Sequence, residues 1–528
     1  MNNLKRERWS SKIGIILAVA GSAVGLGNFL RFPSKVASYG GGAFMIPYFI
    51  SLFLLGIPLM WIEWTLGRYG GGFEHGTAPG IFHSVWRKNR FIKYFGVIGI
   101  FGPLVIFIYY VYIESWTLAY SFFSLFGKYV NIQNQEVMKK FLNGFLGLEN
   151  NQFFNSITTA YIFFLITFVL NVFVAYKGIR GGIEKLCKLA MPSLFIFSII
   201  LVIRVFLLGS PNPENPNLNP INGLGFLWNP NLSLLKSPRV WLEAAGQIFF
   251  TLSVGIGVIL TYASYLSEAE DVALSGLTAV STNEMAEVIL GGSLIIPAAF
   301  TFFGPIETKN IASSGVFNLA FVTMPLILNK LPLNFIFGFL WFFLLFLAGI
   351  TSSISLAQPA IAFLEDEFDL DRKKAVIIFS ILTFILCQFS IFFFKNGIID
   401  ELDFWGGTFC LVLFAMVETI LFGWIFGIDK AWDEMHKGAE IRIPKIYKFI
   451  IKYITPIFLL FILGMWLFYV PEGATESEFV SFIRMINTPN QNKIFVILTR
   501  VILVLIFIVL SILVKIAWKK KRDNFVLN

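Results

Sequence analysis

The residues best suited to bind a small ligand surround two glycine-rich interruptions of apolar segments. Residues 24–28 read V-G-L-G-N in the first apolar segment, and residues 254–257 repeat V-G-I-G in the second half of the chain. Each glycine weakens a helix by about 1 kcal/mol relative to alanine, and a backbone group freed within lipid costs several kcal/mol unless a partner satisfies it. The interruptions therefore predict broken helices that line a binding cavity. Close helix packing is the alternative role of such glycines.

Uncharged side-chain oxygens accompany the two interruptions. Asn28 and Thr251 adjoin them, Asn283 lies in the next apolar segment, and residues 351–353 form a Thr-Ser-Ser run. Hard cations take oxygen ligands, and a set without a carboxylate suits a monovalent cation better than a divalent one. Such a set also leaves room for the carboxylate of a substrate. Taken singly, each side chain has the alternative role of a hydrogen bond between helices.

Charged residues inside apolar segments are further candidates for function. Glu63, Glu114 and Glu287 are the carboxylates that stand out, whereas Arg31 and Asp403 lie at segment ends and could pair across an entrance. Ordinary placement of charged groups at the membrane interface is the alternative for that pair. No nucleophile–base set or metal-ligand spacing occurs, so the sequence does not predict an enzyme.

The elements that must position these residues are about twelve apolar segments, each long enough to cross a ~30 Å hydrocarbon core. The chain of 528 residues is 56% hydrophobic and 14% charged, whereas soluble proteins carry about 25% charged residues. We predict an all-α membrane protein with one polytopic transporter domain, residues 1–528. The segments lie near residues 12–35, 42–67, 94–126, 157–176, 184–208, 240–266, 274–302, 332–364, 373–394, 405–427, 447–470 and 493–516.

The pairing of the two glycine interruptions divides these segments into two sets of five. Residues 10–210 form the first predicted repeat, residues 239–427 form the second, and two additional helices occupy residues 447–516. This is the organisation of a five-plus-five inverted repeat with unwound first and sixth helices.

Basic residues predict how the chain is oriented. Lys and Arg gather in the N-terminal segment, in the loops after segments two and four, and in the C-terminal tail. If successive segments cross the membrane in alternating directions, all of these regions lie on one side. Basic loops face the cytoplasm, so both termini are expected there, in a plasma (inner) membrane. The same rule explains the net charge of +9 without a nucleic-acid partner.

Several long motifs, which follow one another in the family's order, resemble the neurotransmitter:sodium symporter family over nearly the whole chain. The resemblance is closest to its bacterial leucine-transporting members. That family is itself the standard example of a broken-helix transporter. The motifs are residues 21–33, 61–64 (W-I-E-W), 109–116 (Y-Y-V-Y-I-E-S-W), 247–253 (Q-I-F-F-T-L-S), 283–284 (N-E) and 348–353 (A-G-I-T-S-S).

The resemblance implies a substrate site for an amino acid. The N–H groups of Leu26 and Gly27 and the Tyr110 hydroxyl would bind its carboxylate. Its ammonium group would meet carbonyl groups of the two interruptions, and its side chain would enter a mostly apolar pocket. The implied substrate-binding residues are Ser22, Ala23, Leu26, Gly27, Ile106, Tyr110, Phe250, Thr251, Ser253, Ile256, Ser352 and Leu356.

The resemblance also implies two sodium ions and two gates. One sodium would be held by Ala23, Asn28, Thr251, Asn283 and the substrate carboxylate, and the second by Gly21, Val24, Ala348, Thr351 and Ser352. Arg31 and Asp403, with Tyr110 and Phe250, would form the outer gate, and Arg6, Trp9, Tyr265 and Asp366 the inner one. Glu287 occupies the position where chloride-dependent relatives have serine, which suggests charge balance by the carboxylate and chloride independence.

The predicted function is therefore sodium-coupled import of a neutral hydrophobic, leucine-like amino acid by alternating access. Relative to the leucine-transporting members, Ile256 replaces phenylalanine, Ile106 replaces valine and Leu356 replaces isoleucine, so the pocket wall stays apolar. One methylene discriminates by only about 1–3 kcal/mol, which favours a range of small aliphatic substrates. A channel and a non-transporting sensor are the alternatives, and a homodimer remains open.

Overall fold

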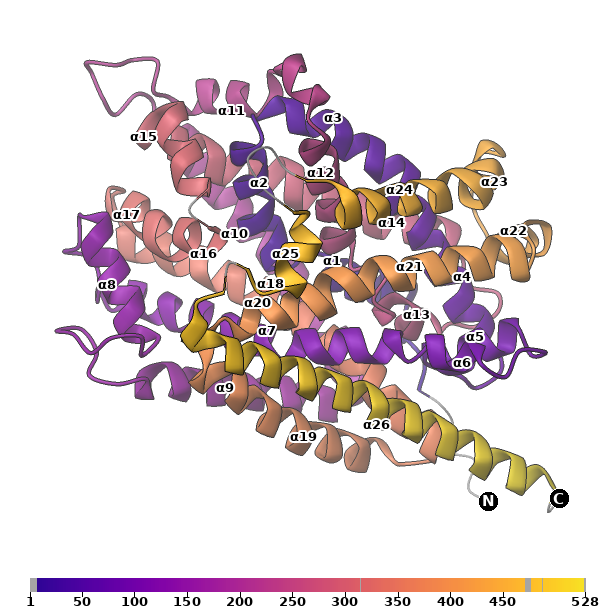
Figure 1. Ribbon diagram of the computed structural model, residues 1–528. Coiled ribbons are helices and arrows are strands. Elements are labelled where there is room, and N and C mark those ends of the chain that lie inside the picture. The colour runs from indigo at the N-terminus through magenta and orange to yellow at the C-terminus, as the bar shows by residue number, and fades with distance from the viewer. Residues whose placement is uncertain (1–6, 314, 471–475, 487, 527–528) are drawn as a thin grey trace.

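The computed structural model describes residues 7–313, 315–470, 476–486 and 488–526, and these residues form a bundle of helices (Figure 1). No strand occurs among them. Ten helical units in the described part of the chain are long and apolar enough to cross a membrane. The all-α fold predicted from the sequence is confirmed.

The spanning units include short π-helical turns. In chain order they are α3 Gly42–Ser51 with α4 Ile57–Gly71, α6 Ile92–Phe95 with α7 Ile98–Leu125, α9 Thr158–Tyr176, α10 Glu184–Phe206, α14 Ala273–Glu284 with α15 Gly292–Ser313, α18 Asn334–Phe368, α19 Arg372–Phe392, α20 Ile398–Leu402 with η8 Asp403–Phe409 and α21 Cys410–Ile420, α23 Ile446–Phe449 with α24 Thr455–Phe468, and α26 Lys493–Val526. The main connecting helices are α5 Ala78–Val85, α8 Gln135–Phe145, α11 Pro220–Trp228, α16 Val316–Asn318, α17 Met324–Asn329, α22 Ile428–Met435 and α25 Glu478–Ile483.

Two further units are broken where the glycines predicted. The first runs through α1 (Lys12–Ala23), the π-helical turn η1 (Gly27–Arg31) and α2 (Phe32–Ser38), with a bend of 45°. The second comprises α12 (Pro238–Leu252) and α13 (Val258–Ala263), separated by five non-helical residues, 253–257. The ten units listed above and these two pairs correspond to the twelve predicted segments.

The second break requires glycine at its end. Gly257 has φ +82°, and a Cβ atom there would lie 2.5 Å from the main-chain oxygen of Gly99 on α7. A substituted residue would meet both the steric cost of a positive φ and a clash with a rigid backbone. The break is therefore fixed by local composition and by close packing on α7.

Glu63 on α4 satisfies a backbone group that this break frees. Its side chain is fully buried, and its Oε1 accepts a hydrogen bond from the Gly255 N–H at 2.5 Å. Without this acceptor, burying the freed N–H within the bundle would cost several kcal/mol. This contact explains the role of one of the intramembrane carboxylates found in the sequence.

The start of α1 and the end of α26 lie on the same face of the bundle. Lys12 at the start of α1 pairs with Glu440, at 2.6 Å, just after α22. The end of α4 lies next to α22, because Arg68 contacts Glu434 there. His75, in the segment that follows α4, stacks on Trp518 near the end of α26. In Figure 1 this face lies at the right, with α5, α13 and α22, and α8 and α17 lie toward the opposite end.

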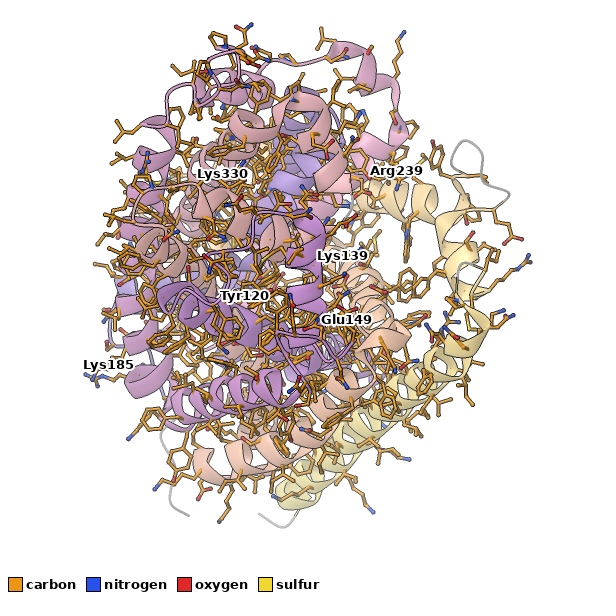
Figure 2. All side chains as sticks on the ribbon, turned by 90° about the vertical axis from the view of Figure 1, so that its left-hand side faces the viewer. Tyr120, Lys139, Glu149, Lys185, Arg239 and Lys330 are labelled. Carbon is orange, nitrogen blue, oxygen red and sulfur yellow. The ribbon has the colours of Figure 1, made fainter. Side chains whose placement is uncertain are left out.

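The packing core is unusually aromatic. Tyr120 on α7 is fully buried, and its ring contacts those of neighbours on α7, α8, α18 and the segment between α16 and α17, including Phe141, Phe321 and Phe342. Figure 2 shows Tyr120 inside this mass of side chains, whereas the labelled Lys185 projects from the edge of the molecule. The inner helices are thus held largely by ring packing.

Candidate functional site

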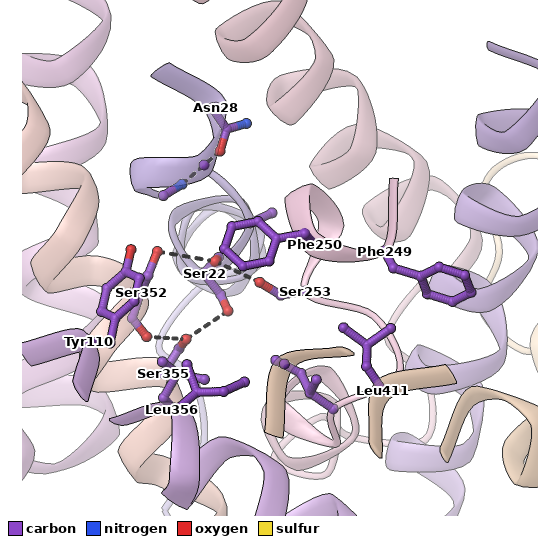
Figure 3. A pocket seen from close by; sticks show the side chains of 16 residues that line it. Ser22, Asn28, Tyr110, Phe249, Phe250, Ser253, Ser352, Ser355, Leu356 and Leu411 are labelled. Atoms are coloured by element: carbon purple, nitrogen blue, oxygen red, sulfur yellow. Dashed lines mark hydrogen bonds between the residues drawn. The ribbon is translucent and has the colours of Figure 1, made fainter. Parts of the chain in front are cut away.

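A cavity of about 50 Å³ lies where both helix breaks meet α7, α18 and the η8–α21 helix (Figure 3). Main-chain and side-chain atoms from both breaks reach its wall, as the glycine pattern predicted. The lining residues are Ser22, Ala23, Gly25, Gly27, Asn28, Ile106, Tyr110, Phe249, Phe250, Ser253, Ile256, Ser352, Ser355, Leu356, Gly407 and Leu411. Of the implied substrate-binding residues, only Leu26 and Thr251 are not on this wall.

The aromatic wall of the cavity depends on Gly27. A Cβ atom at Gly27 would lie 2.5 Å from the Phe250 ring, so only glycine lets the ring lie against the first break. The two breaks are therefore in direct contact across the cavity. Leu26, although outside the wall, donates its N–H to the Tyr110 hydroxyl oxygen at 3.3 Å. The Tyr110 hydroxyl therefore lies against the first break, where the Ser352 side chain also interacts with it.

Asn28 connects the two breaks with the α14 helix. Its Oδ1 accepts from the Gly25 N–H at 2.9 Å, and its Nδ2 donates to Thr251 Oγ1 at 3.0 Å. The same amide lies 2.8 Å from the side-chain amide of Asn283. The side chains implied for the first sodium are thus brought together, and all three are buried.

The Glu287 carboxylate contacts this group of side chains through Thr251. Glu287 is fully buried and accepts hydrogen bonds from Tyr48 at 2.8 Å, from Gln247 at 3.1 Å and from the Thr251 hydroxyl. A neighbouring carboxylate, Glu284, accepts from the same Tyr48 hydroxyl at 2.9 Å. Donors from three residues therefore lie within hydrogen-bond distance of this one buried carboxylate.

The Thr-Ser-Ser run of α18 faces the first break. The Thr351 hydroxyl donates within α18 to the carbonyl oxygens of Leu347, at 3.1 Å, and Ala348, at 3.2 Å. The Ser352 hydroxyl contacts the Ala348 oxygen at 3.0 Å and reaches the Gly21 oxygen at 3.3 Å. The oxygens implied for the second sodium therefore converge from α1 and α18. They are neutral groups, which fits a monovalent cation.

The implied outer-gate residues do not form a direct ion pair in the described chain. The Arg31 guanidinium lies over the Phe250 ring, 4.4 Å from its centroid, while Asp403 accepts from the Tyr109 hydroxyl at 2.6 Å. Tyr109, and not its neighbour Tyr110, is therefore the tyrosine that binds Asp403. The phenylalanine of the predicted gate does contact Arg31.

The implied inner-gate residues lie on the opposite side of the cavity, except that Arg6 falls outside the described residues. The Trp9 indole donates to the Tyr262 carbonyl on α13 at 3.0 Å, and the Tyr265 hydroxyl accepts from Gln358 at 2.8 Å. Asp366 lies near the end of α18, one residue before Glu367, which contacts His75 at 2.8 Å. These contacts bring α1, α13 and α18 together at one face.

Sequence reasoning missed several lining residues. Ser355 follows Ser352 by three positions on one helix, so helical spacing could have found it. Gly407 and Leu411 come from a segment that reads as an ordinary apolar span, with no local signal of a site. Ser355 adds a fourth hydroxyl to the three on the wall that the resemblance implied, those of Ser22, Ser253 and Ser352.

Within the described residues, no group of three or more His, Cys, Asp or Glu side chains could hold a metal ion.

Known proteins similar to this chain are transporters rather than enzymes. A sodium-dependent transporter of Methanocaldococcus jannaschii is 31% identical over 466 residues, covering 87% of this chain and 90% of its own length. A sodium-dependent nutrient amino acid transporter of Drosophila erecta is 25% identical, covering 87% of this chain and 77% of its own.

A solved structure agrees in fold and length. The crystal structure of MhsT in complex with L-phenylalanine matches with a TM-score of 0.74 and 30% identity, covering 87% of this chain and 99% of that chain. Residues 6–136 and 127–519 match the Sodium:neurotransmitter symporter family. With this sequence match, the broken helices and the shared fold, the chain belongs to the sodium:neurotransmitter symporter family, as a multi-pass, sodium-dependent membrane transporter.

Proposed function

We propose that this protein is a symporter that couples sodium entry to the import of a neutral, mainly aliphatic amino acid by alternating access. The observation that supports this most directly is the cavity between the two helix breaks, which combines main-chain atoms with apolar walls. An amino acid presents one carboxylate and one ammonium, and the breaks offer N–H groups and carbonyl oxygens respectively. The apolar part of the wall, including Ile106, Ile256 and Leu356, carries no charge that would pair with a charged side chain.

Two sodium ions are the proposed coupled substrates. We assign the first to Ala23, Asn28, Thr251, Asn283 and the carboxylate of the amino acid, and the second to Gly21, Val24, Ala348, Thr351 and Ser352. Because the substrate carboxylate is itself a ligand of the first sodium, each ligand raises the affinity of the other by the same factor. The sodium gradient and the membrane potential then drive uptake.

The second sodium assignment makes a specific prediction for Thr351→Ala. The variant removes one neutral oxygen ligand but leaves the side-chain pocket intact, so the sodium concentration for half-maximal uptake should rise about tenfold. The expected change corresponds to the loss of roughly one hydrogen-bond-sized contact, about 1.4 kcal/mol. Sodium titrations of leucine and valine uptake measure it. A change in the leucine-to-valine preference with unaltered sodium dependence would contradict the assignment.

The remaining features follow from the same proposal. Arg31 and Asp403 would close the outer side, and Arg6, Trp9, Tyr265 and Asp366 the inner side. Residues 10–210 and 239–427 are the proposed inverted repeats, with 447–516 outside them. The face that carries the start of α1 and the end of α26 would be cytoplasmic in a plasma (inner) membrane. A homodimer would leave the transport site within each protomer.

The decisive experiment is uptake of labelled L-leucine into proteoliposomes with and without an inward sodium gradient. We expect accumulation above the equilibrium level only with the gradient, and a response to membrane potential. Flux that is indifferent to sodium would reject coupled symport. Sodium-dependent binding without any flux would favour a sensor.

A further inference from the structure

Each of the four serines on the cavity wall donates its hydroxyl proton in a hydrogen bond within the protein. Ser253 donates to the Ser22 carbonyl oxygen at 2.9 Å, and Ser355 donates to the Ser352 carbonyl oxygen at 2.7 Å. Ser352 donates to carbonyl oxygens of α18 and α1, the nearest being that of Ala348 at 3.0 Å. A hydroxyl has one proton and two acceptor lone pairs, so these three groups face the cavity as acceptors.

The direction of the fourth hydrogen bond, that of the Ser22 hydroxyl, follows from the direction of the Ser355 hydrogen bond. The Oγ atoms of Ser22 and Ser355 are 2.7 Å apart, and a single proton must lie between them. Because the Ser355 proton is directed at a carbonyl, which cannot donate, Ser22 supplies this one. Ser22 Oγ therefore also presents only lone pairs. Both side chains are nearly fully buried, at 3% and 1% exposed, so no bulk water satisfies those acceptors.

The position of this pair decides what it can bind. Figure 3 places the Ser22–Ser355 contact beside Leu356 and away from Asn28, at the end of the cavity where Leu411 forms the facing wall. Under the proposed function, carbonyl oxygens of the two breaks bind the ammonium group of the amino acid, with Ser253 close by. The acceptors of the Ser22–Ser355 pair are therefore not needed for the head group.

We propose that the Ser22–Ser355 hydroxyl pair recognises a hydrogen-bond donor on the substrate side chain, so that hydroxylated neutral amino acids are substrates alongside aliphatic ones. This inference rests on the proposed function, because it assigns the side-chain end of the same site. A buried acceptor left without a donor is unfavourable, whereas one new neutral hydrogen bond strengthens binding by roughly two- to tenfold. A hydrogen bond to the pair thus replaces the hydrogen bond that a substrate hydroxyl gives up with water when it enters the cavity.

L-threonine and L-valine test this directly, because they have the same shape and differ in one hydroxyl for one methyl group. Calorimetric titration of the purified full-length protein in saturating NaCl gives the two affinities and their threonine-to-valine ratio. Ser22→Ala should lower that ratio about three- to tenfold. Ser198→Ala is the matched control, because Ser198 is equally buried, donates to the Leu194 carbonyl at 2.8 Å and lies outside the cavity.

Ser22→Cys provides a second variant of nearly native volume with a weaker acceptor, and it should lower the ratio in the same direction. A threonine-to-valine ratio that is unchanged in both variants, while sodium-dependent leucine binding persists, would overturn this inference alone. Absence of sodium-dependent binding of leucine, valine and threonine to the unmodified protein would instead overturn the proposed function. The two failures are therefore distinguishable in one set of titrations.

Discussion

Glu287→Ser should make transport dependent on chloride, with uptake in chloride-free buffer reduced about 100-fold or more. The Glu287 carboxylate accepts hydrogen bonds from Tyr48, Gln247 and Thr251 in a fully buried position. Truncating one partner of such a buried charged contact costs about 2–5 kcal/mol, and about 2.7 kcal/mol corresponds to 100-fold. Chloride can occupy the space that the shorter side chain leaves and restore a negative charge opposite the same donors.

Leucine uptake into proteoliposomes, with chloride replaced by gluconate inside and out, measures this effect. Glu284→Ser is the matched control, because Glu284 also accepts from Tyr48, at 2.9 Å, yet makes no contact with Thr251 in the described structure. We expect the control to transport without chloride. Equal uptake by Glu287→Ser in the two buffers would show that the carboxylate does not act as the balancing charge.

Arg68→Ala should lower the free energy of unfolding by about 3–5 kcal/mol, the largest stability effect we expect of a single substitution. The Arg68 side chain is 1% exposed at the end of α4. Its guanidinium donates to the main-chain oxygens of Glu270 at 2.5 Å and Lys437 at 2.9 Å, and to the main chain and carboxylate of Glu434. Hydrogen bonds to charged groups contribute about 1.5–3 kcal/mol each, and several are lost together.

Thermal and denaturant unfolding of the purified protein test this prediction, and hydrogen exchange should show the α13–α14 and α22–α23 connections opening first. Arg68→Lys should retain part of the stability, because a single ammonium cannot reach all the acceptors of a planar guanidinium. Arg87→Ala is the control, since Arg87 lies exposed over the Phe73 ring near the same face. Equal stability of Arg68→Ala and Arg87→Ala would contradict the argument.

The helix breaks could be predicted from sequence because their cause is local. Glycine and asparagine at residues 24–28 and glycine at 255 and 257 disfavour a continuous helix wherever the segment is placed. Apolar length likewise predicted the spanning helices. The partners of the polar residues were predictable only where a family motif brought them together, as for Asn28, Thr251 and Asn283.

Features that depend on how distant helices rotate against each other could not be predicted. Tyr109 and Tyr110 are adjacent, yet a turn of about 100° directs one to Asp403 and the other to the Leu26 N–H. Arg68 reads in sequence as one of the basic residues that mark a cytoplasmic loop, whereas the fold buries it among carbonyl oxygens. Gly407 and Leu411 reach the cavity wall only through tertiary packing.

The contribution of the polypeptide backbone to the cavity has an evolutionary consequence. Every residue type keeps a main-chain carbonyl group, and every type except proline keeps an N–H, so most point mutations at the two breaks leave these groups in place, although one at a key glycine can displace them. Side chains such as Ser22, Ile256 and Leu356 have no such protection. Under the proposed function, lineages descended from an ancestor of this architecture can therefore exchange one substrate side chain for another through a few codon changes, while recognition of the amino-acid head group is inherited almost unaltered.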